Sequence, residues 1–276
     1  MELRQFLQTS AVGDLVPWAV QTDAAKRYDL TVAEVEEAIL EQGLMPARYQ
    51  RNRQTIAAGM QLRLFRSRVV VIGSGGLGGY IIEELARLGV GHLVVVDPDV
   101  FEEHNLNRQI LSSPLHLGMP KVDVAAARVR EINPAVTITP LKVSFSTANG
   151  REILEGADAV VDGLDSITSR RELVTLCREM AIPLVHGAIG GWYGQVATQL
   201  PGDDISPNIF GLQPESKGVE AQLGNPSFTP ATVASLQVAE TCKVLLGEGE
   251  SLRHRVLFVN LLNMEFEEVR MDSALG

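Results

Sequence analysis

One stretch early in the chain constrains the fold more than any other. An apolar, β-branched run at 69–72 meets a glycine-rich turn at 73–78, and apolar residues then repeat at helical spacing as far as Leu88. A second apolar run at 92–96 ends at Asp97, 24 positions after the first glycine. This order is typical of a βαβ unit that binds a nucleotide, because the glycines let the backbone turn tightly and approach a phosphate at the N-terminus of the helix. The stretch therefore predicts a Rossmann-like sheet.

The rest of the chain continues the alternation of strands and helices. Strands are predicted at 69–72, 92–96, 136–139, 157–161 and 183–186, and helices at 56–65, 77–88, 121–131, 167–180 and 229–246. Alternation of this kind predicts a doubly wound, mainly parallel sheet of the α/β class. After residue 191 the pattern changes, and antiparallel C-terminal strands are predicted at 193–200, 255–262 and 265–270. A long loop at about 201–226 lies among them, and loops of this length are usually functional.

The first part of the chain has a different pattern, and we expect a small N-terminal helical element at 1–47 beside a domain at 48–276. Thr31 and Glu34 fit a capping box ahead of apolar residues at helical spacing. Residues 17–20 are turn-like. A helix-turn-helix is one interpretation of this element, but its glutamates would repel phosphate groups, so a docking or dimer-packing role is favoured.

Composition limits the function classes. The chain has 276 residues and a net charge of −10, which argues against nucleic acid bound across a broad basic surface. No apolar run has the length of a membrane span and no signal pattern opens the chain, so we expect a cytoplasmic protein without a membrane partner. The two cysteines, Cys177 and Cys242, form no CxxC pair, which excludes a four-cysteine zinc site. Both are expected to be buried as small apolar side chains.

Three polar segments lie at the ends of predicted parallel strands or just beyond, where open α/β sheets bind ligands. They are 105–109 (NLNRQ), 118–121 (GMPK) and 162–166 (DGLDS). Arginine and lysine can neutralise a triphosphate, and an aspartate can hold Mg²⁺ against it. The glycine turn and Asp97 alone favour NAD, whereas the two added cations and the acid favour ATP.

In this order and spacing, the segments GSGGLG, DPDVFEEHNLNRQ, GMPK and DGLDS resemble the motifs of the ThiF/MoeB/HesA family, relatives of ubiquitin-activating enzymes. The resemblance extends over about residues 48–270. It implies an enzyme that uses ATP and Mg²⁺ to adenylate a carboxylate and releases pyrophosphate. The expected partner is a ubiquitin-like sulfur-carrier protein ending in Gly-Gly, or another carboxylate, and the expected assembly is a homodimer.

The resemblance also implies a role for each matching residue. The expected ATP-binding residues are Gly73, Gly75, Gly76, Gly78, Asp97, Asp99, Asn105, Arg108, Gln109 and Lys121. Among them, Asp97 would bind the ribose hydroxyls. Arg108 and Lys121 would stabilise charge on the α-phosphate and on the leaving pyrophosphate, and Asp165 would organise Mg²⁺. The family places an arginine of the partner subunit on the γ-phosphate within an RYxR motif, and the matching residue here is Arg51.

Several of these residues have a structural alternative. Asp97 could simply end a strand, and Arg108 and Lys121 could be solvated surface cations. Asn105 could stabilise its own loop through an Asx turn.

Asp165 could likewise cap the following helix, with Asp162 as a substitute metal ligand. The role expected of Arg51 has three nearby alternatives, the arginines at positions 48, 53 and 63. His186 ends a predicted strand and is expected to be a core histidine with satisfied hydrogen bonds.

The chain departs from the family in two places. Members that bind zinc carry two CxxC pairs, and members that trap the acyl group covalently carry a cysteine in the crossover loop, but residues 201–226 contain none. We therefore expect the chemistry to stop at the acyl-adenylate. A smaller change is Ser166, where the family commonly has asparagine. Two other functions stay open: an NAD-dependent oxidoreductase, and a non-catalytic nucleotide-binding scaffold that docks a carrier protein.

Overall fold

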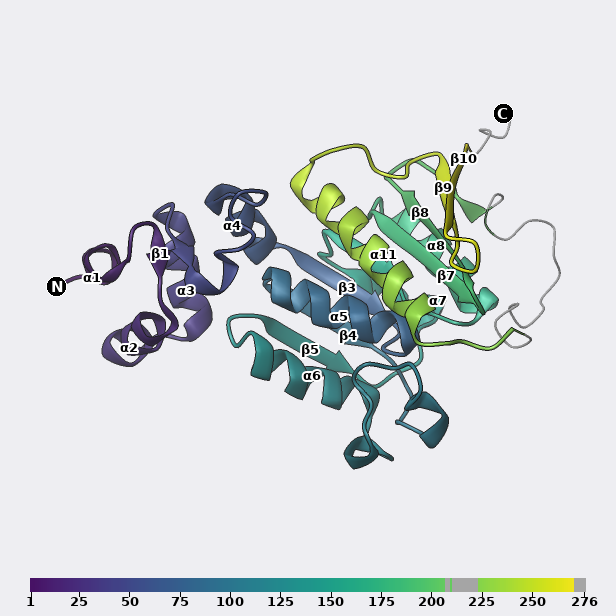
Figure 1. The fold of residues 1–276 in the computed structure, drawn as a ribbon, viewed down its shortest axis with the longest axis horizontal. Coiled ribbons are helices and arrows are strands. Elements are labelled where there is room, and N and C mark those ends of the chain that lie inside the picture. Colours follow the sequence, from purple (N-terminus) through teal and green to yellow (C-terminus); the bar gives the residue numbers. More distant parts are fainter. Residues whose placement is uncertain (207–208, 210–222, 271–276) are drawn as a thin grey trace.

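The computed structural model describes residues 1–206, 209 and 223–270. Its centre is an eight-stranded sheet with the order β10-β9-β8-β7-β6-β3-β4-β5 (Figure 1). The strands are β3 (Arg68–Ile72), β4 (His92–Val96), β5 (Thr137–Leu141), β6 (Ala159–Asp162), β7 (Leu184–Gly190), β8 (Tyr193–Gln199), β9 (Arg255–Asn260) and β10 (Glu265–Arg270). Strands β3 to β7 pair in parallel, and β8, β9 and β10 extend the sheet antiparallel from β7. The predicted fold class is confirmed.

The parallel strands bring their carboxyl ends to one edge of the sheet. β3 lies between β4 and β6, and the register pairs Ile72 with both Val96 and Asp162. The chain therefore leaves these three strands side by side, and the loops after them meet. This edge is where an open α/β sheet binds its ligands.

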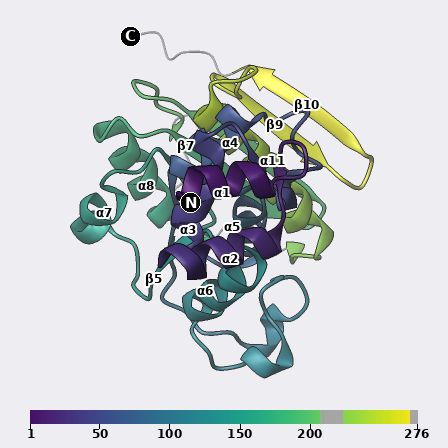
Figure 2. The same cartoon turned by 90° about the vertical axis from the view of Figure 1, so that its left-hand side faces the viewer.

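Helices cover both faces of the sheet. One face is covered by α5 (Gly76–Leu88), α6 (Lys121–Ile132) and α11 (Phe228–Leu246), and the other by α7 (Thr147–Leu154) and α8 (Ile167–Glu179) (Figures 1 and 2). Successive residues of β3 point to opposite faces, so Val69 and Val71 join the first core while Val70 and Ile72 join the second. Burial on both faces explains why β3 is an almost continuous β-branched run. The sequence pattern did not reveal α7.

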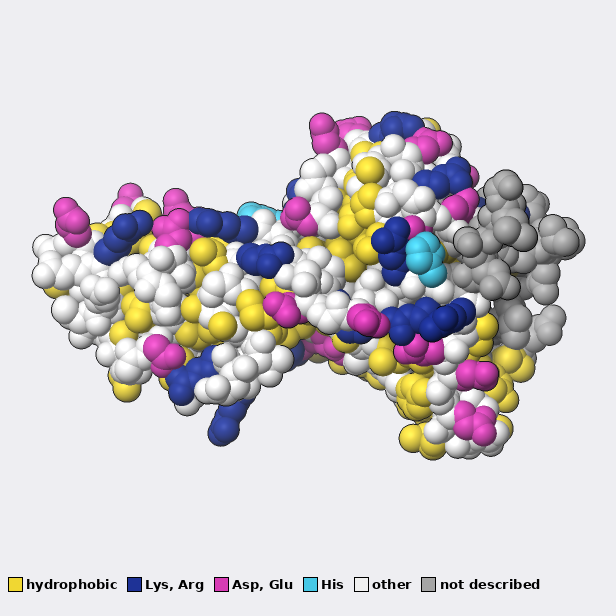
Figure 3. All heavy atoms as spheres, turned by 90° about the horizontal axis from the view of Figure 1, so that it is seen from above, with side chains coloured by type: hydrophobic (Ala, Val, Ile, Leu, Met, Phe, Trp, Pro, Cys, Tyr) yellow, Lys and Arg dark blue, Asp and Glu magenta, His cyan; other side chains and the backbone are white. Residues whose placement is uncertain are grey.

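The N-terminal part forms an arm that projects from the sheet domain (Figure 3). Its elements are α1 (Leu3–Ser10), β1 (Leu15–Val16), α2 (Trp18–Tyr28), α3 (Val32–Glu41), β2 (Met45–Pro46), a 3₁₀ turn (Ala47–Tyr49) and α4 (Ala58–Arg66). A small core of its own holds the first three helices together. The capping box is confirmed, because Glu34 N–H donates to Thr31 Oγ1 at 3.2 Å and Thr31 N–H donates to Glu34 at 2.7 Å.

The prediction of a turn at 17–20 was wrong, because α2 begins at Trp18. Proline does fit immediately before a helix, since its fixed φ angle suits that position and it has no N–H to leave unpaired. The boundary between an N-terminal element at 1–47 and a domain at 48–276 stays a prediction. Among the helices described, none is long and apolar enough to cross a membrane.

A buried polar junction attaches the arm to the sheet domain. The Tyr49 hydroxyl donates to Glu36 at 2.7 Å and accepts from the Asn133 amide at 2.8 Å, while Arg48 donates to Asn133. Burial raises the pKa of the Glu36 carboxyl, and Arg48 at 3.6 Å opposes that shift. The first two residues of the RYQR segment are therefore structural in this chain.

Candidate active site

A pocket of about 770 Å³ opens at the carboxyl edge of the parallel strands. Its lining comes from the loops after four strands, within 73–77 after β3, 97–99 after β4, 143–145 after β5 and 163–166 after β6. Arg108, Gln109, Lys121 and the first turn of α8, from Ile167 to Arg170, also line the pocket. The three polar segments expected to meet at this edge therefore do meet there.

The glycine turn has the shape that the sequence predicted, and two of its glycines are required by the packing. Gly73 has φ +94°, and a Cβ atom on it would lie 2.5 Å from the carbonyl oxygen of Gly163. A Cβ atom on Gly78 would lie 1.9 Å from the carbonyl oxygen of Gly73. Gly73, Gly75 and Gly76 line the pocket, whereas Gly78 closes the turn beneath it.

Asp97 is almost fully buried at the end of β4 and holds two turns in place. Its carboxylate accepts from Ser74 N–H at 2.7 Å, from Ser74 Oγ at 3.0 Å and from Asp99 N–H at 2.8 Å. It still lines the pocket. Asp97 therefore fixes the glycine turn and also presents a carboxylate edge to any ligand there.

The two predicted phosphate cations lie in the same pocket. Lys121 opens α6, is 6% exposed, and its Nζ lies 3.1 Å from Asp99 Oδ2. Arg108 is partly buried, and its Nη1 donates to the carbonyl oxygen of His104 and to Asn107 Oδ1, both at 2.9 Å. These contacts fix its loop but leave the guanidinium without an ion pair among the described residues. Charge on Arg108 is thus available to a ligand.

Gln109 and Asn105 differ in their relation to the pocket. Gln109 is 6% exposed, lines the pocket beside Gly75, and its Oε1 is buried without a hydrogen-bond partner among the described residues. Asn105 lines a smaller neighbouring pocket of about 340 Å³ with Asp99 and Lys121. Its side-chain oxygen accepts from Glu102 N–H at 2.9 Å, which is the loop-stabilising role that the sequence left as an alternative.

Asp162 ends β6, whereas Asp165 lies in the loop that follows this strand. Asp165 is exposed, lines the pocket, and has no hydrogen-bond or ion-pair partner in the part of the chain that the structure describes. The helix cap is supplied by Ser166, whose Oγ accepts from Ser169 N–H at 3.4 Å. Asp162 points the other way, into the core, and its Oδ1 accepts from Leu164 N–H at 2.9 Å. The capping alternative for Asp165 is therefore wrong.

A magnesium ion bound together with a nucleotide fits this donor set. No group of three or more His, Cys, Asp or Glu side chains within the described residues could hold a metal by itself. Mg²⁺ is commonly bound by one or two carboxylates together with substrate phosphates. Asp165, unpartnered among the described residues and beside two cations, is the side chain that can share a cation with a triphosphate.

Some residues of the pocket were not found from the sequence. Residues 143–145 line it because they come after β5, but Val, Ser and Phe carry no signal of ligand chemistry. Asn225 lines it from the far end of the long loop, and Asn107 Nδ2 donates to its carbonyl oxygen at 3.3 Å. Residues 207–208 and 210–222 of the predicted crossover loop lie outside the described residues.

Arg51 does not line the pocket. It is exposed in the turn after the 3₁₀ helix, at the junction of the arm and the sheet domain. A role in the pocket of its own chain is therefore not supported, and only an action on a second copy stays open.

The surroundings of the two cysteines make both thiols poor nucleophiles. Burial, with a smaller contribution from Asp162, raises the pKa of Cys177 to about 12. Burial, with a smaller contribution from Glu84, raises the pKa of Cys242 to about 11. Because the thiolate is the reactive form, neither thiol is poised for nucleophilic chemistry near neutral pH.

Known proteins share this sequence pattern. The ThiF family model matches residues 49–275. SAMP-activating enzyme E1 of Haloferax volcanii is 44% identical over 211 residues, which cover 76% of this chain and 78% of that protein. Sulfur carrier protein adenylyltransferase of Thermus thermophilus is 37% identical over 218 residues, covering 76% and 80%. Molybdopterin-synthase adenylyltransferase of Escherichia coli is 31% identical over 226 residues, covering 80% and 91%.

The fold is shared with solved structures of lower identity. Escherichia coli MccB, crystallised with ATP, superposes with a TM-score of 0.70 at 18% identity and covers 91% of this chain and 82% of its own. PaaA superposes with a TM-score of 0.70 at 20% identity, covering 82% and 73%. The doubly wound sheet and the family match over most of the chain show that this protein belongs to the ThiF family, as an adenylyltransferase of the ubiquitin-like-protein-activating type.

Proposed function

We propose that this protein adenylates the C-terminal Gly-Gly carboxylate of a ubiquitin-like sulfur-carrier protein with Mg·ATP and releases pyrophosphate. One observation carries the proposal: Arg108 from the connection after β4, Lys121 from the first turn of α6 and Asp165 from the loop after β6 line one pocket with the glycine turn. The named relatives that activate SAMP, sulfur-carrier protein and molybdopterin synthase support the choice of substrate class.

The residues fit the charge changes of the reaction. A carboxylate oxygen attacks the α-phosphorus, the bond from that phosphorus to the bridging oxygen breaks, and pyrophosphate leaves with the electron pair. Negative charge grows on the α-phosphate and on the leaving group. Arg108 and Lys121 would stabilise both, because fixed cations in a partly dry site act most strongly where charge develops.

The other residues would hold the nucleotide in place. Amide groups of the turn at 73–76 and the N-terminus of α5 would bind phosphate oxygens. The carboxylate of Asp97 would accept a hydrogen bond from a ribose hydroxyl in the pocket. Asp165 would hold Mg²⁺, which as a Lewis acid draws charge from the phosphates.

The second subunit and the long loop complete the proposal. Arg51 is exposed outside its own pocket, which agrees with an action on the ATP of a second copy in a homodimer. The loop at 201–226 would cover the carrier tail. With no cysteine in that loop and two largely buried thiols elsewhere, the product would be the acyl-adenylate. A cytoplasmic location remains part of the proposal.

ATP–pyrophosphate exchange tests the function. Purified protein with a carrier that ends in Gly-Gly should exchange labelled pyrophosphate into ATP only when Mg²⁺ and the carrier are both present. Arg108→Ala should slow exchange about 100-fold. Arg128→Ala is the matched control, because Arg128 lies outside the pocket and pairs with Glu83 on α5.

Two outcomes favour other functions. Tight ATP binding without exchange, across carriers and short Gly-Gly peptides, would support the non-catalytic scaffold. Preferential binding of NADH over ATP would support the oxidoreductase, for which the named relatives give no support.

A further inference from the structure

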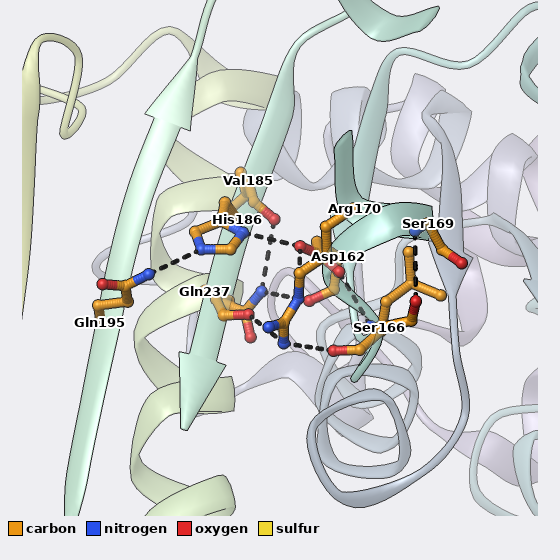
Figure 4. A network of polar contacts seen from close by, with 10 residues as sticks. Asp162, Ser166, Ser169, Arg170, Val185, His186, Gln195 and Gln237 are labelled. Carbon is orange, nitrogen blue, oxygen red and sulfur yellow. Dashed lines mark hydrogen bonds and ion pairs between the residues drawn. The ribbon is translucent and has the colours of Figure 1, made fainter. Parts of the chain in front are cut away.

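A buried polar cluster lies directly behind the loop that carries Asp165. Its centre is Asp162 at the end of β6, with His186 from β7 and Arg170 from α8 (Figure 4). Asp162 and His186 are 0% exposed and Arg170 is 4% exposed. Asp162 Oδ2 lies 2.7 Å from His186 Nδ1 and 3.5 Å from Arg170 Nε. Three strongly polar groups are thus buried beside the pocket. Their loss of hydration costs free energy, which only well-placed contacts among them can offset.

The surroundings of the histidine in this cluster favour its neutral form. Burial lowers its pKa, the Arg170 charge lowers it further, and Asp162 acts in the opposite direction. A neutral imidazole beside a carboxylate carries its proton on Nδ1, so His186 donates to Asp162. Its Nε2 then accepts from the Gln195 amide on β8 at 3.2 Å. This pair of contacts fixes the orientation of the ring.

The cluster fixes the backbone of the loop from two sides. Asp162 Oδ1 accepts from Leu164 N–H at 2.9 Å, which forms an Asx turn immediately before Asp165. Arg170 Nη2 donates to the carbonyl oxygen of Leu164 and, at 3.3 Å, to that of Gly187. The residue before Asp165 is therefore held through both its N–H and its carbonyl group.

Helix α11 supports the same arrangement through one side chain. Gln237 on α11 donates through its amide to the carbonyl oxygen of Asp162 at 2.8 Å and to that of Val185 at 3.4 Å. β6 and β7 are thereby fixed to one another where the loop begins. Rotation of the Asp162 side chain would break its contacts with His186 on β7, Arg170 on α8 and the N–H of Leu164.

We infer that His186 is a positioning residue for the metal-binding carboxylate: it holds Asp162 so that the Asx turn directs Asp165 into the pocket. The inference rests on the proposed function in one respect, namely that Asp165 shares Mg²⁺ with ATP. His186 itself does not line the pocket and is not a catalytic residue. Its effect reaches the nucleotide through Asp162 and Leu164.

Two substitutions of His186 distinguish the effect of its hydrogen bond to Asp162 from the effect of its side-chain size. In His186→Asn the side-chain amide lies near the place of Nδ1 and can still donate to Asp162. In His186→Gln the amide lies near the place of Nε2, so the bond to Asp162 is lost although the side chain is larger. Arg178→Lys is the matched control, because Arg178 lies on the same helix as Arg170 but pairs with Asp204 at the surface.

Metal binding is the direct readout. The Mn²⁺ dissociation constant is measured by electron paramagnetic resonance in the presence of a non-hydrolysable ATP analogue, with the analogue's affinity in EDTA measured beside it. His186→Gln should raise the Mn²⁺ constant about tenfold, the lower end of what outer-shell partners contribute. His186→Asn and Arg178→Lys should stay within about twofold of wild type, and the metal-free affinity should not change in any variant.

The Mn²⁺ dissociation constants of the variants can support or overturn the role of His186. Equal Mn²⁺ constants in all proteins, or the same loss in both His186 variants, would overturn the inference, because orientation of Asp162 would then be irrelevant. If His186→Gln does not fold, Gln195→Leu replaces it, since leucine is of similar size but cannot donate to His186 Nε2, so the ring loses one of the two bonds that orient it. A wild-type protein that binds Mn²⁺ with the analogue but performs no exchange would defeat the proposed function and leave this inference standing.

Discussion

Asp162, at the end of β6, and Asp165, in the loop that follows, are three positions apart, yet their surroundings are opposite. Asp162 is fully buried and contacts His186, Arg170 and Leu164. Asp165 is exposed and has no polar partner among the described residues. A buried charge needs partners to exist in the folded state, whereas a ligand-binding charge must keep its oxygens available. The hydrogen-bond and ion-pair partners of a carboxylate, more than its residue type, therefore separate a structural role from a ligand-binding role.

The same comparison holds between the arm junction and the pocket. Tyr49, Glu36, Asn133 and Arg48 contact one another and are largely closed to solvent. Arg108 and Lys121, by contrast, make one or two contacts each and still face the pocket. The second arginine of the RYQR segment, Arg51, belongs to neither group, because it is exposed, lies outside the pocket and has no polar partner among the described residues.

The largest effect should come from Asp165→Asn. This change removes the negative charge that would hold Mg²⁺, and it should lower the rate of ATP–pyrophosphate exchange about 100-fold or more. Since the side chain is exposed, the free energy of unfolding should change by less than about 0.5 kcal/mol. Urea unfolding beside the exchange assay measures both. A retained exchange rate would remove Asp165 from the proposed site.

The change Asp162→Ala should act on stability, which Asp165→Asn leaves almost unchanged. Removing one member of a buried charged cluster leaves Arg170 and His186 without their carboxylate, and should lower the free energy of unfolding by about 3–5 kcal/mol. Urea denaturation followed by circular dichroism measures it. Asp158→Ala is the control, because that carboxylate accepts a backbone N–H at the exposed start of β3. Equal stability of the two variants would contradict the contrast between Asp162 and Asp165.

The smallest effect is a pH dependence of stability that comes from His186. Burial lowers its pKa from the ordinary value of 6.5, so the unfolded chain binds this proton at a higher pH than the folded protein does. Its contribution is therefore complete above about pH 6.5 and is lost as the pH falls through the folded pKa, by at most about 1.4 kcal/mol per pH unit. Urea midpoints between about pH 7.5 and 5 should fall in wild type and fall less in His186→Asn. Parallel curves for the two proteins would show that His186 does not titrate on unfolding.

Much of the fold could be predicted because its signals are local. The β-branched run of β3, the glycine turn and the helical spacing of α5 identify a βαβ unit within 28 residues, from 69 to 96. The antiparallel extension was also predicted, from a change of pattern after residue 191. In contrast, α7 was missed, and the start of α2 was interpreted as a turn because Pro17 precedes it. A proline before a helix and a proline in a turn are distinguished only by the conformation of the next few residues.

The sequence predicted most residues of the candidate site, but not the contacts that these residues make in the folded protein. The motifs named the glycines, Asp97, Arg108, Lys121 and Asp165, and all of these but Gly78 line one pocket. No spacing could show that Asn105 bonds its own loop, or that residues 143–145 form part of the wall. Those facts depend on which loops meet at the sheet edge.

By itself, the sequence determined the class of sheet, the nucleotide-binding turn and the residue types available for ATP chemistry, because local spacing and backbone requirements carry that information. Only the tertiary structure decided which of two aspartates three positions apart is buried and which is free to bind, and which half of the RYQR segment is structural. The physical reason is that burial and hydrogen-bond partners come from distant elements. For Asp162 they come from β7 and α8, and for Tyr49 from α3 and the end of α6.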